Sequence, residues 1–112
     1  MNALLPQLIA ALILVESNSD AGAIGDGGRA LGCLQIHACV IEDVNRHYNR
    51  SFKHDDALDM DKAIMICELY LRMYAPPGAT MEQLARIWNG GPKGHKKACT
   101  KVYWQKVKRY LG

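Results

Sequence analysis

The chain has 112 residues, of which 49% are hydrophobic and 22% charged. This is the size and composition of one globular domain, so we expect a single domain over residues 1–112 and exclude a second core, intrinsic disorder and a fibrous repeat. The formal net charge is only +3, and the longest apolar run, Leu8 to Val15, is far shorter than the roughly 20 residues that cross a bilayer, so no transmembrane segment is expected.

The same apolar run does not resemble a secretory signal peptide. Residues 1–15 contain no Lys or Arg, and the acidic Glu16 follows directly, whereas a signal peptide begins with positive charge. We therefore expect this run to form part of the mature fold, with no signal peptide in this chain.

The first predicted element is a helix from about residue 4 to 17. Its apolar residues recur at helical spacing: Leu5, Leu8, Ile9, Leu12 and Val15. Glu16 lies four residues after Leu12 and therefore shares the buried stripe. Residues 17–29 are polar and contain four glycines, which predicts a loop or a short irregular hairpin.

Helical patterns continue through the rest of the chain. A short helix is expected near residues 38–48, and a polar loop follows to about residue 59. Either Asp59 or Asp61 can cap a third helix, which must stop before the Pro-Pro-Gly sequence at 76–78.

Two more helices complete the predicted fold. Thr80 and Gln83 form a capping box that opens a fourth helix, which ends at residues 89–92. Thr100 can cap a last helix whose apolar face carries Tyr103, Val107, Tyr110 and Leu111. The predicted fold class is all-α, with at most a small β element in the glycine-rich loop.

The four cysteines show neither a CxxC pair nor a histidine at metal-ligand spacing, so no zinc site is expected. Cys33 and Cys67 have apolar neighbours and fit small core positions. Cys39 with Cys99 is the disulfide pairing to test first.

Positive charge is concentrated at the C-terminal end. No acidic residue follows Glu82, and the stretch from residue 93 onward holds seven of the chain's fourteen cations: Lys93, Lys96, Lys97, Lys101, Lys106, Lys108 and Arg109. We refer to these seven residues as the basic tail. Such a surface suits a polyanion, which includes nucleic acid, anionic lipid and bacterial wall polymers, and the simpler interpretation is a solvated helix face.

Glu16 is unusual because it lies at the end of an apolar helix. Burial and the negative end of the helix dipole both raise the pKa of a carboxyl group. A carboxylic acid that stays protonated near neutral pH can donate a proton, as cleavage of a glycosidic bond requires. The alternative is a glutamate that points into solvent where the stripe ends.

Two further groups carry polar chemistry. Asp26 stands among glycines in the loop, where it either provides a second carboxylate or only forms a turn. Trp88 and Asn89 lie at a predicted helix end, where an aromatic ring can stack on a sugar and an amide can bind hydroxyls, or where both are core and C-cap.

Three segments in order resemble a known superfamily. They are Ile13–Ser17, Ala30–Ile36 and Ala85–Pro92, and they are similar to the Glu-Ser, Gly-Leu-Met-Gln-like and Tyr-Asn-Ala-Gly-like segments of lysozyme-like lytic transglycosylases and goose-type lysozymes. The closing residues 89–94, with Thr100 and Tyr103-Trp104, also resemble invertebrate-type lysozymes. The resemblance covers about residues 8 to 107 and implies a mainly helical lysozyme-like fold.

This resemblance implies roles for individual residues. Glu16 matches the general acid, Gln35 matches a groove-lining amide, and Trp88-Asn89 stands where the family's Tyr-Asn lines the cleft. Ser17 and Gly90 belong to the same segments and are expected to bind substrate. Cys33 replaces a Leu and Trp88 replaces a Tyr of the common pattern, and neither change removes a proton donor.

Asp26 separates two reactions. It lies nine residues before Gln35, where such transglycosylases tend to carry Ser, whereas goose-type and invertebrate-type lysozymes carry an Asp in this region. A second carboxylate can activate water or stabilise an oxocarbenium-like transition state. We therefore predict a muramidase that hydrolyses the MurNAc-GlcNAc bond of peptidoglycan, and the alternative is a lytic transglycosylase in which Glu16 alone yields 1,6-anhydro-MurNAc ends.

Such an enzyme needs no metal or organic cofactor, because proton transfer and charge stabilisation suffice. We expect a monomer that acts on glycan strands of the cell wall, in the periplasm, after secretion or after release by a phage. A basic helical module that binds nucleic acid is supported by the tail, but it lacks a recognisable helix-turn-helix or aromatic platform, so no nucleic acid is expected. A catalytically inactive wall-binding module is disfavoured because Glu16 is intact.

Overall fold

The computed structural model describes residues 5–111, and these residues form five α-helices. Their bounds are α1 Leu5–Ser17, α2 Ala38–Tyr48, α3 Met60–Tyr74, α4 Met81–Gly90 and α5 Lys101–Lys108. The predicted all-α class is confirmed, and each predicted helix is present. The expected start of the first helix at residue 4 lies outside the described residues.

The glycine-rich loop contains the expected small β element. Strands β1 (Ile24–Gly25) and β2 (Ala30–Leu31) pair antiparallel, with Ile24 opposite Leu31. A 3₁₀ turn, η1 (Asp26–Gly28), joins them. Three further 3₁₀ turns connect the helices: η2 (His54–Leu58), η3 (Gly94–Lys96) and η4 (Ala98–Thr100).

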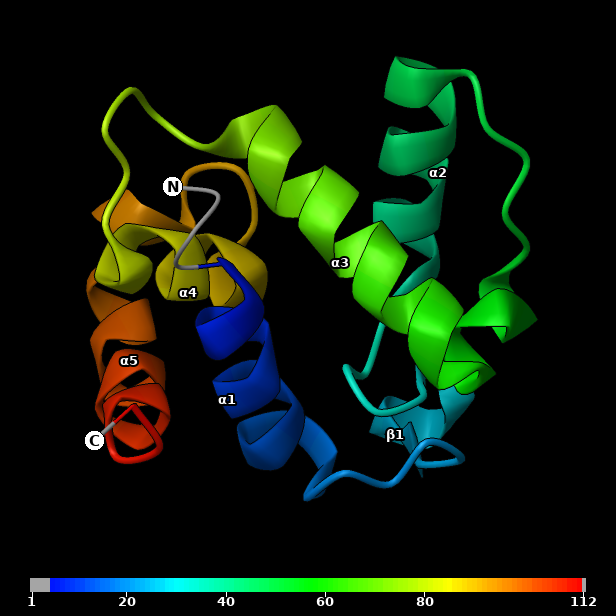
Figure 1. Cartoon of the computed structure of the whole chain (residues 1–112), viewed down its shortest axis with the longest axis horizontal. Helices are drawn as coiled ribbons and strands as arrows, with labels where there is room; N and C mark the ends of the chain where they lie inside the picture. The colour runs from blue at the N-terminus through cyan, green and yellow to red at the C-terminus, as the bar shows by residue number, and fades with distance from the viewer. Residues whose placement is uncertain (1–4, 112) are drawn as a thin grey trace.

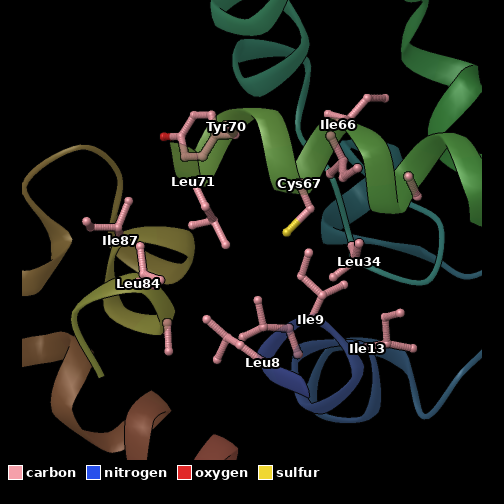
Figure 2. Close-up of a cluster of buried hydrophobic side chains, with 14 of the residues drawn as sticks. Leu8, Ile9, Ile13, Leu34, Ile66, Cys67, Tyr70, Leu71, Leu84 and Ile87 are labelled. Carbon is pink, nitrogen blue, oxygen red and sulfur yellow. The ribbon is translucent and has the colours of Figure 1, made fainter. Parts of the chain in front are cut away.

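Helix α3 crosses the middle of the molecule, with α2 on one side and α1, α4 and α5 on the other (Figure 1). The small hairpin lies below α2, beyond the C-terminal end of α1 (Figure 1). Leu8, Ile9 and Ile13 of α1 form part of the core, facing the side chains of α3, whose Cys67 and Leu71 are fully buried (Figure 2). The helices thus share one apolar core, and the hairpin lies at its edge.

Local sequence explains where the helices begin. The Asp59 side chain accepts a hydrogen bond from the Lys62 amide, so Asp59 and not Asp61 caps α3. The predicted capping box of α4 is confirmed, since Thr80 and Gln83 each bind the other's backbone amide.

The last helix differs from the prediction in two ways. Thr100 precedes α5, but its hydroxyl does not cap the helix. Instead Thr100 is buried, accepts a hydrogen bond from Nε of the buried Arg86 at 2.8 Å, and donates to backbone carbonyls of the preceding turns. Tyr110, predicted on the apolar face, is exposed because α5 ends at Lys108.

All four cysteines are free. Cys33 and Cys67 are buried in the core, as predicted, whereas Cys39 and Cys99 are exposed and do not form the pairing suggested from the sequence. Within residues 5–111, no helix is both long enough and apolar enough to cross a membrane.

Candidate active site

An open pocket of about 310 Å³ lies where α1, the hairpin, α2 and α4 meet. Glu16 and Asp26 both line it, so the structure brings the two predicted carboxylates to one place although they come from different elements. The complete lining consists of Glu16, Asp26, Ala30, Gln35, His37, Val40, Trp88 and Asn89.

Glu16 projects from the last turn of α1 and is partly buried. Its Oε2 accepts a hydrogen bond of 2.6 Å from the Tyr103 hydroxyl of α5. Burial raises the pKa of Glu16, and the Tyr103 hydrogen bond and the nearby Lys106 ammonium oppose this effect without cancelling it. The raised pKa favours the protonated acid, in agreement with the expectation from the sequence.

Tyr103 is a site residue that the sequence reasoning placed only in the core. It is buried, and burial together with the neighbouring Glu16 raises the pKa of its phenol. The hydroxyl therefore stays protonated and serves as a permanent donor to Glu16. The sequence feature that could have identified Tyr103 is its hydroxyl on a predicted buried helix face, because a buried tyrosine hydroxyl requires a hydrogen-bond partner.

Asp26 occupies the tip of the hairpin, and its side chain is 52% exposed. Its backbone has a φ of 50°, and Gly27 and Gly28 after it also have positive φ, which the glycines adopt at little cost. The Asp26 carboxylate lies 3.5 Å from Nε2 of His37 and 3.8 Å from the guanidinium of Arg29. The Asp26 carboxylate thus faces both solvent and the pocket, beside one guanidinium and one imidazole.

Gln35 lines the pocket, but its amide also holds the hairpin. Its Nε2 donates to the carbonyl oxygens of Ala23 and Gly32 at 3.3 and 3.0 Å. Its Oε1 lies against Gly25, where any side chain would collide with it. Gln35 therefore fixes the position of the strand that leads to Asp26.

Trp88 and Asn89 reach the pocket from the last turn of α4. The Trp88 ring packs edge-on against Tyr70, with centroids 5.7 Å apart. This contact fixes the orientation of the indole, which remains partly exposed to the pocket.

Ser17 and Gly90 lie outside the pocket lining. The Ser17 hydroxyl donates to the Cys33 carbonyl at 2.8 Å and ties α1 to the segment after the hairpin. The Gly90 carbonyl accepts a hydrogen bond from Nζ of Lys97 at 2.7 Å. The contacts of both residues position neighbouring pocket residues.

His37 was also missed by the sequence reasoning, although it follows Gln35-Ile36 directly. It precedes α2, and its ring lies beside Asp26 in the pocket. No group of three His, Cys, Asp or Glu side chains within residues 5–111 is arranged to hold a metal ion.

Most of the basic tail is exposed around α5 and the turns before it. Two of its lysines have specific neighbours: Lys97 donates a hydrogen bond to the Gly90 carbonyl, and the charge of Lys106 lowers the pKa of Glu16. The remaining cations are available to an anionic partner.

Comparison with known proteins agrees with the resemblance carried by the motifs. The family described as Transglycosylase SLT domain matches residues 1–111. A chain of the crystal structure of Aeromonas hydrophila PliI in complex with Meretrix lusoria lysozyme is similar in fold, with a TM-score of 0.77 and 27% identity, and the match covers 92% of this chain and 87% of that chain. No curated protein sequence gives a significant match.

Proposed function

The chain belongs to the transglycosylase SLT domain family, and from this premise we propose that it is a muramidase that hydrolyses the MurNAc-GlcNAc bond. Family membership makes peptidoglycan the substrate class and glycosidic cleavage of the lytic-transglycosylase type the broad activity. The observation that carries the finer proposal is that Glu16, whose pKa is raised, and Asp26 line one pocket.

In the first step Glu16 protonates the glycosidic oxygen. Because Oε2 accepts the Tyr103 hydrogen bond, the acidic proton resides on Oε1 and is directed to the leaving oxygen. The C–O bond then breaks, and the proton stays with the leaving sugar. Tyr103 acts through Glu16 and is a positioning residue.

In the second step Asp26 assists the addition of water to the sugar carbon. Its exposed carboxylate either accepts a proton from the attacking water or stabilises the positive charge that develops on the ring. In the second case the Glu16 carboxylate left by the first step accepts the proton of the water, which restores the acid. Trp88 and Asn89 supply a stacking surface and an amide to the sugar that occupies the pocket. No step requires a metal or cofactor.

A lytic transglycosylase is the second candidate, because the description of the family favours it. In that reaction Glu16 first donates its proton and then takes one from the sugar's own hydroxyl, which attacks in place of water. Asp26 would then be a turn residue, and the product would end in 1,6-anhydro-MurNAc.

The setting of the reaction is the cell wall. The basic tail gives the protein an exposed cationic surface that attracts anionic wall polymers and raises the local concentration of substrate. We expect a monomer to be sufficient, since one chain supplies both carboxylates. Nucleic acid and purely structural wall binding explain the tail but leave the acid in the pocket without a role.

A turbidity assay on purified cell walls tests the proposal. Wild type should clear the suspension, and Glu16→Gln should lower the rate by roughly 10²–10⁴-fold, because the amide keeps the shape of the side chain but donates no acidic proton. Glu42→Gln makes the same change at an exposed position of α2 and should behave as wild type. Wall clearance by Glu16→Gln within tenfold of wild type would reject Glu16 as the acid.

A further inference from the structure

A second pocket lies next to the active pocket and shares His37 with it. Its volume is about 350 Å³, and it is bounded by the hairpin, the start of α2 and η2. Its lining consists of Gly28, Arg29, His37, Ala38, Cys39 and His54. We name it the Arg29 pocket. The lining contains one permanent cation and two imidazoles, and it contains no carboxylate.

Arg29 keeps donors available for a ligand. Its Nε donates to the Asp26 carbonyl at 3.2 Å, which holds the base of the guanidinium in place. The contact to the Asp26 carboxylate is longer, 3.8 Å, and 76% of the side chain is exposed. A guanidinium has five N–H donors, and its geometry matches a carboxylate. Most of this capacity is therefore unused by the protein.

His54 is held so that one ring nitrogen is available. Its Nε2 lies 2.7 Å from the Ile36 carbonyl oxygen, and because a carbonyl oxygen only accepts, Nε2 carries the hydrogen. The remaining Nδ1 can bind a ligand, and it becomes a donor when the ring is protonated. Ile36 is fully buried, so the anchor for this ring is firm.

We propose that the Arg29 pocket binds a carboxylate carried by the glycan beside the sugar in the active pocket. This inference rests on the proposed function and specifies its substrate. His37 lines both pockets, so a substituent of a bound sugar passes from one to the other along a single side chain. Muramic acid carries such a substituent, a lactyl ether that ends in a free carboxylate or continues into a peptide stem with carboxylates of its own.

The two exposed cysteines allow a direct test of occupancy. Cys39 lines the Arg29 pocket, whereas Cys99 is equally free and lies in η4, away from this pocket. The rate of iodoacetamide alkylation at each is measured by mass spectrometry in the full chain carrying Glu16→Gln, so that added strands are not consumed. Soluble peptide-bearing strands should slow alkylation of Cys39 and leave Cys99 unchanged.

Three ligands identify the group that binds. Peptide-bearing strands and strands stripped by an amidase both carry carboxylates, whereas chitin oligosaccharides carry none. Protection by stripped strands assigns the lactyl carboxylate, and protection by peptide-bearing strands alone assigns the stem. Equal protection by chitin oligosaccharides would overturn the proposal, because the pocket would then recognise sugar rather than charge.

Substitutions separate this proposal from the proposed function. Arg29→Gln keeps a polar side chain but removes the guanidinium charge. Together with His54→Gln, which keeps an amide donor for the Ile36 carbonyl, it should weaken protection of Cys39 by about tenfold. Arg72→Gln, which removes an exposed charge paired with Glu68 on α3, should leave it unchanged. Wild-type cleavage of strands without protection of Cys39 would refute the Arg29 pocket alone, and protection without cleavage would refute the muramidase.

Discussion

The two walls of the active pocket are built differently. On the helix side Glu16 comes from α1, is partly buried, and is held by Tyr103 of α5. On the hairpin side Asp26 stands at a glycine-rich tip, half exposed, with His37 and Arg29 as neighbours. Packed helices raise the pKa of one carboxyl group, and the loop places the other beside solvent, an imidazole and a guanidinium.

This difference fits the two tasks of a glycosidase. A proton donor needs an environment that disfavours its charge, whereas a group that assists water or stabilises a cation must be ionised. The fold buries Glu16, which suits the proton donor, and it exposes Asp26 to solvent, which suits the group that assists water. It follows that variants on the helix wall should act through protonation, and variants on the hairpin wall through charge.

Asp26→Asn gives the largest effect expected on the hairpin wall. Asparagine tolerates the positive φ of this position and preserves the side-chain size, so only the charge is lost. We expect the rate of wall cleavage to fall by about a hundredfold, at the lower end of what a general base contributes, with an unchanged circular dichroism spectrum. Asp55→Asn, at an exposed position in η2, is the matched control. A loss below threefold would mean that Asp26 only forms the turn.

Tyr103→Phe tests the helix wall with a smaller effect. The Tyr103 hydrogen bond holds the pKa of Glu16 down against burial, so its removal should raise the pKa of Glu16 further. The acid then stays protonated to higher pH, so the alkaline limb of the pH–rate profile moves to higher pH. Misorientation of the carboxyl should also lower the maximal rate, by up to about tenfold.

The control for this variant is Tyr48→Phe, which removes a hydroxyl bonded to the Leu69 carbonyl away from the pocket. It should lower thermal stability without moving the alkaline limb. An unmoved limb in Tyr103→Phe would assign Tyr103 to packing only.

The smallest effect concerns the basic tail, which belongs to neither wall. Replacing Lys96, Lys101 and Lys108 with Gln should weaken wall binding a few-fold at low salt and little at high salt, because salt screens exposed charges. Lys97 and Lys106 are kept, because Lys97 donates a hydrogen bond to the Gly90 carbonyl and the charge of Lys106 lowers the pKa of Glu16. Pelleting of the protein with purified walls measures the binding. A loss that is equal at all salt concentrations would indicate packing rather than electrostatic attraction.

The sequence predicts what depends on neighbours along the chain. The helices, an aspartate cap at residue 59 or 61 and the Thr80 capping box follow from spacing within a few residues, although only the structure selects Asp59. Glu16 stands out because an acid ends an apolar stripe. The hairpin could be anticipated only as a β element among glycines, because its strands are two residues long.

Contacts between distant elements could not be predicted in this way. The bond between Tyr103 and Glu16 joins residues 87 positions apart, and periodicity reports only that Tyr103 faces inward. Thr100 looked like a helix cap, yet its hydroxyl satisfies the buried Arg86 and nearby carbonyls instead, because a buried charge requires partners. His37 and Asp26 lie eleven positions apart, and only the folded hairpin shows that their side chains are neighbours.

The masses of the released glycan ends test the central claim, that two carboxylates in contrasting environments hydrolyse the bond. Purified walls are digested with wild type, and the soluble fragments are analysed by mass spectrometry. The account predicts reducing MurNAc ends, heavier by one water than anhydro ends, and these ends should become labelled in H₂¹⁸O. A predominance of 1,6-anhydro-MurNAc would contradict it, remove Asp26 from the chemistry and leave Glu16 as the sole acid and base of a lytic transglycosylase.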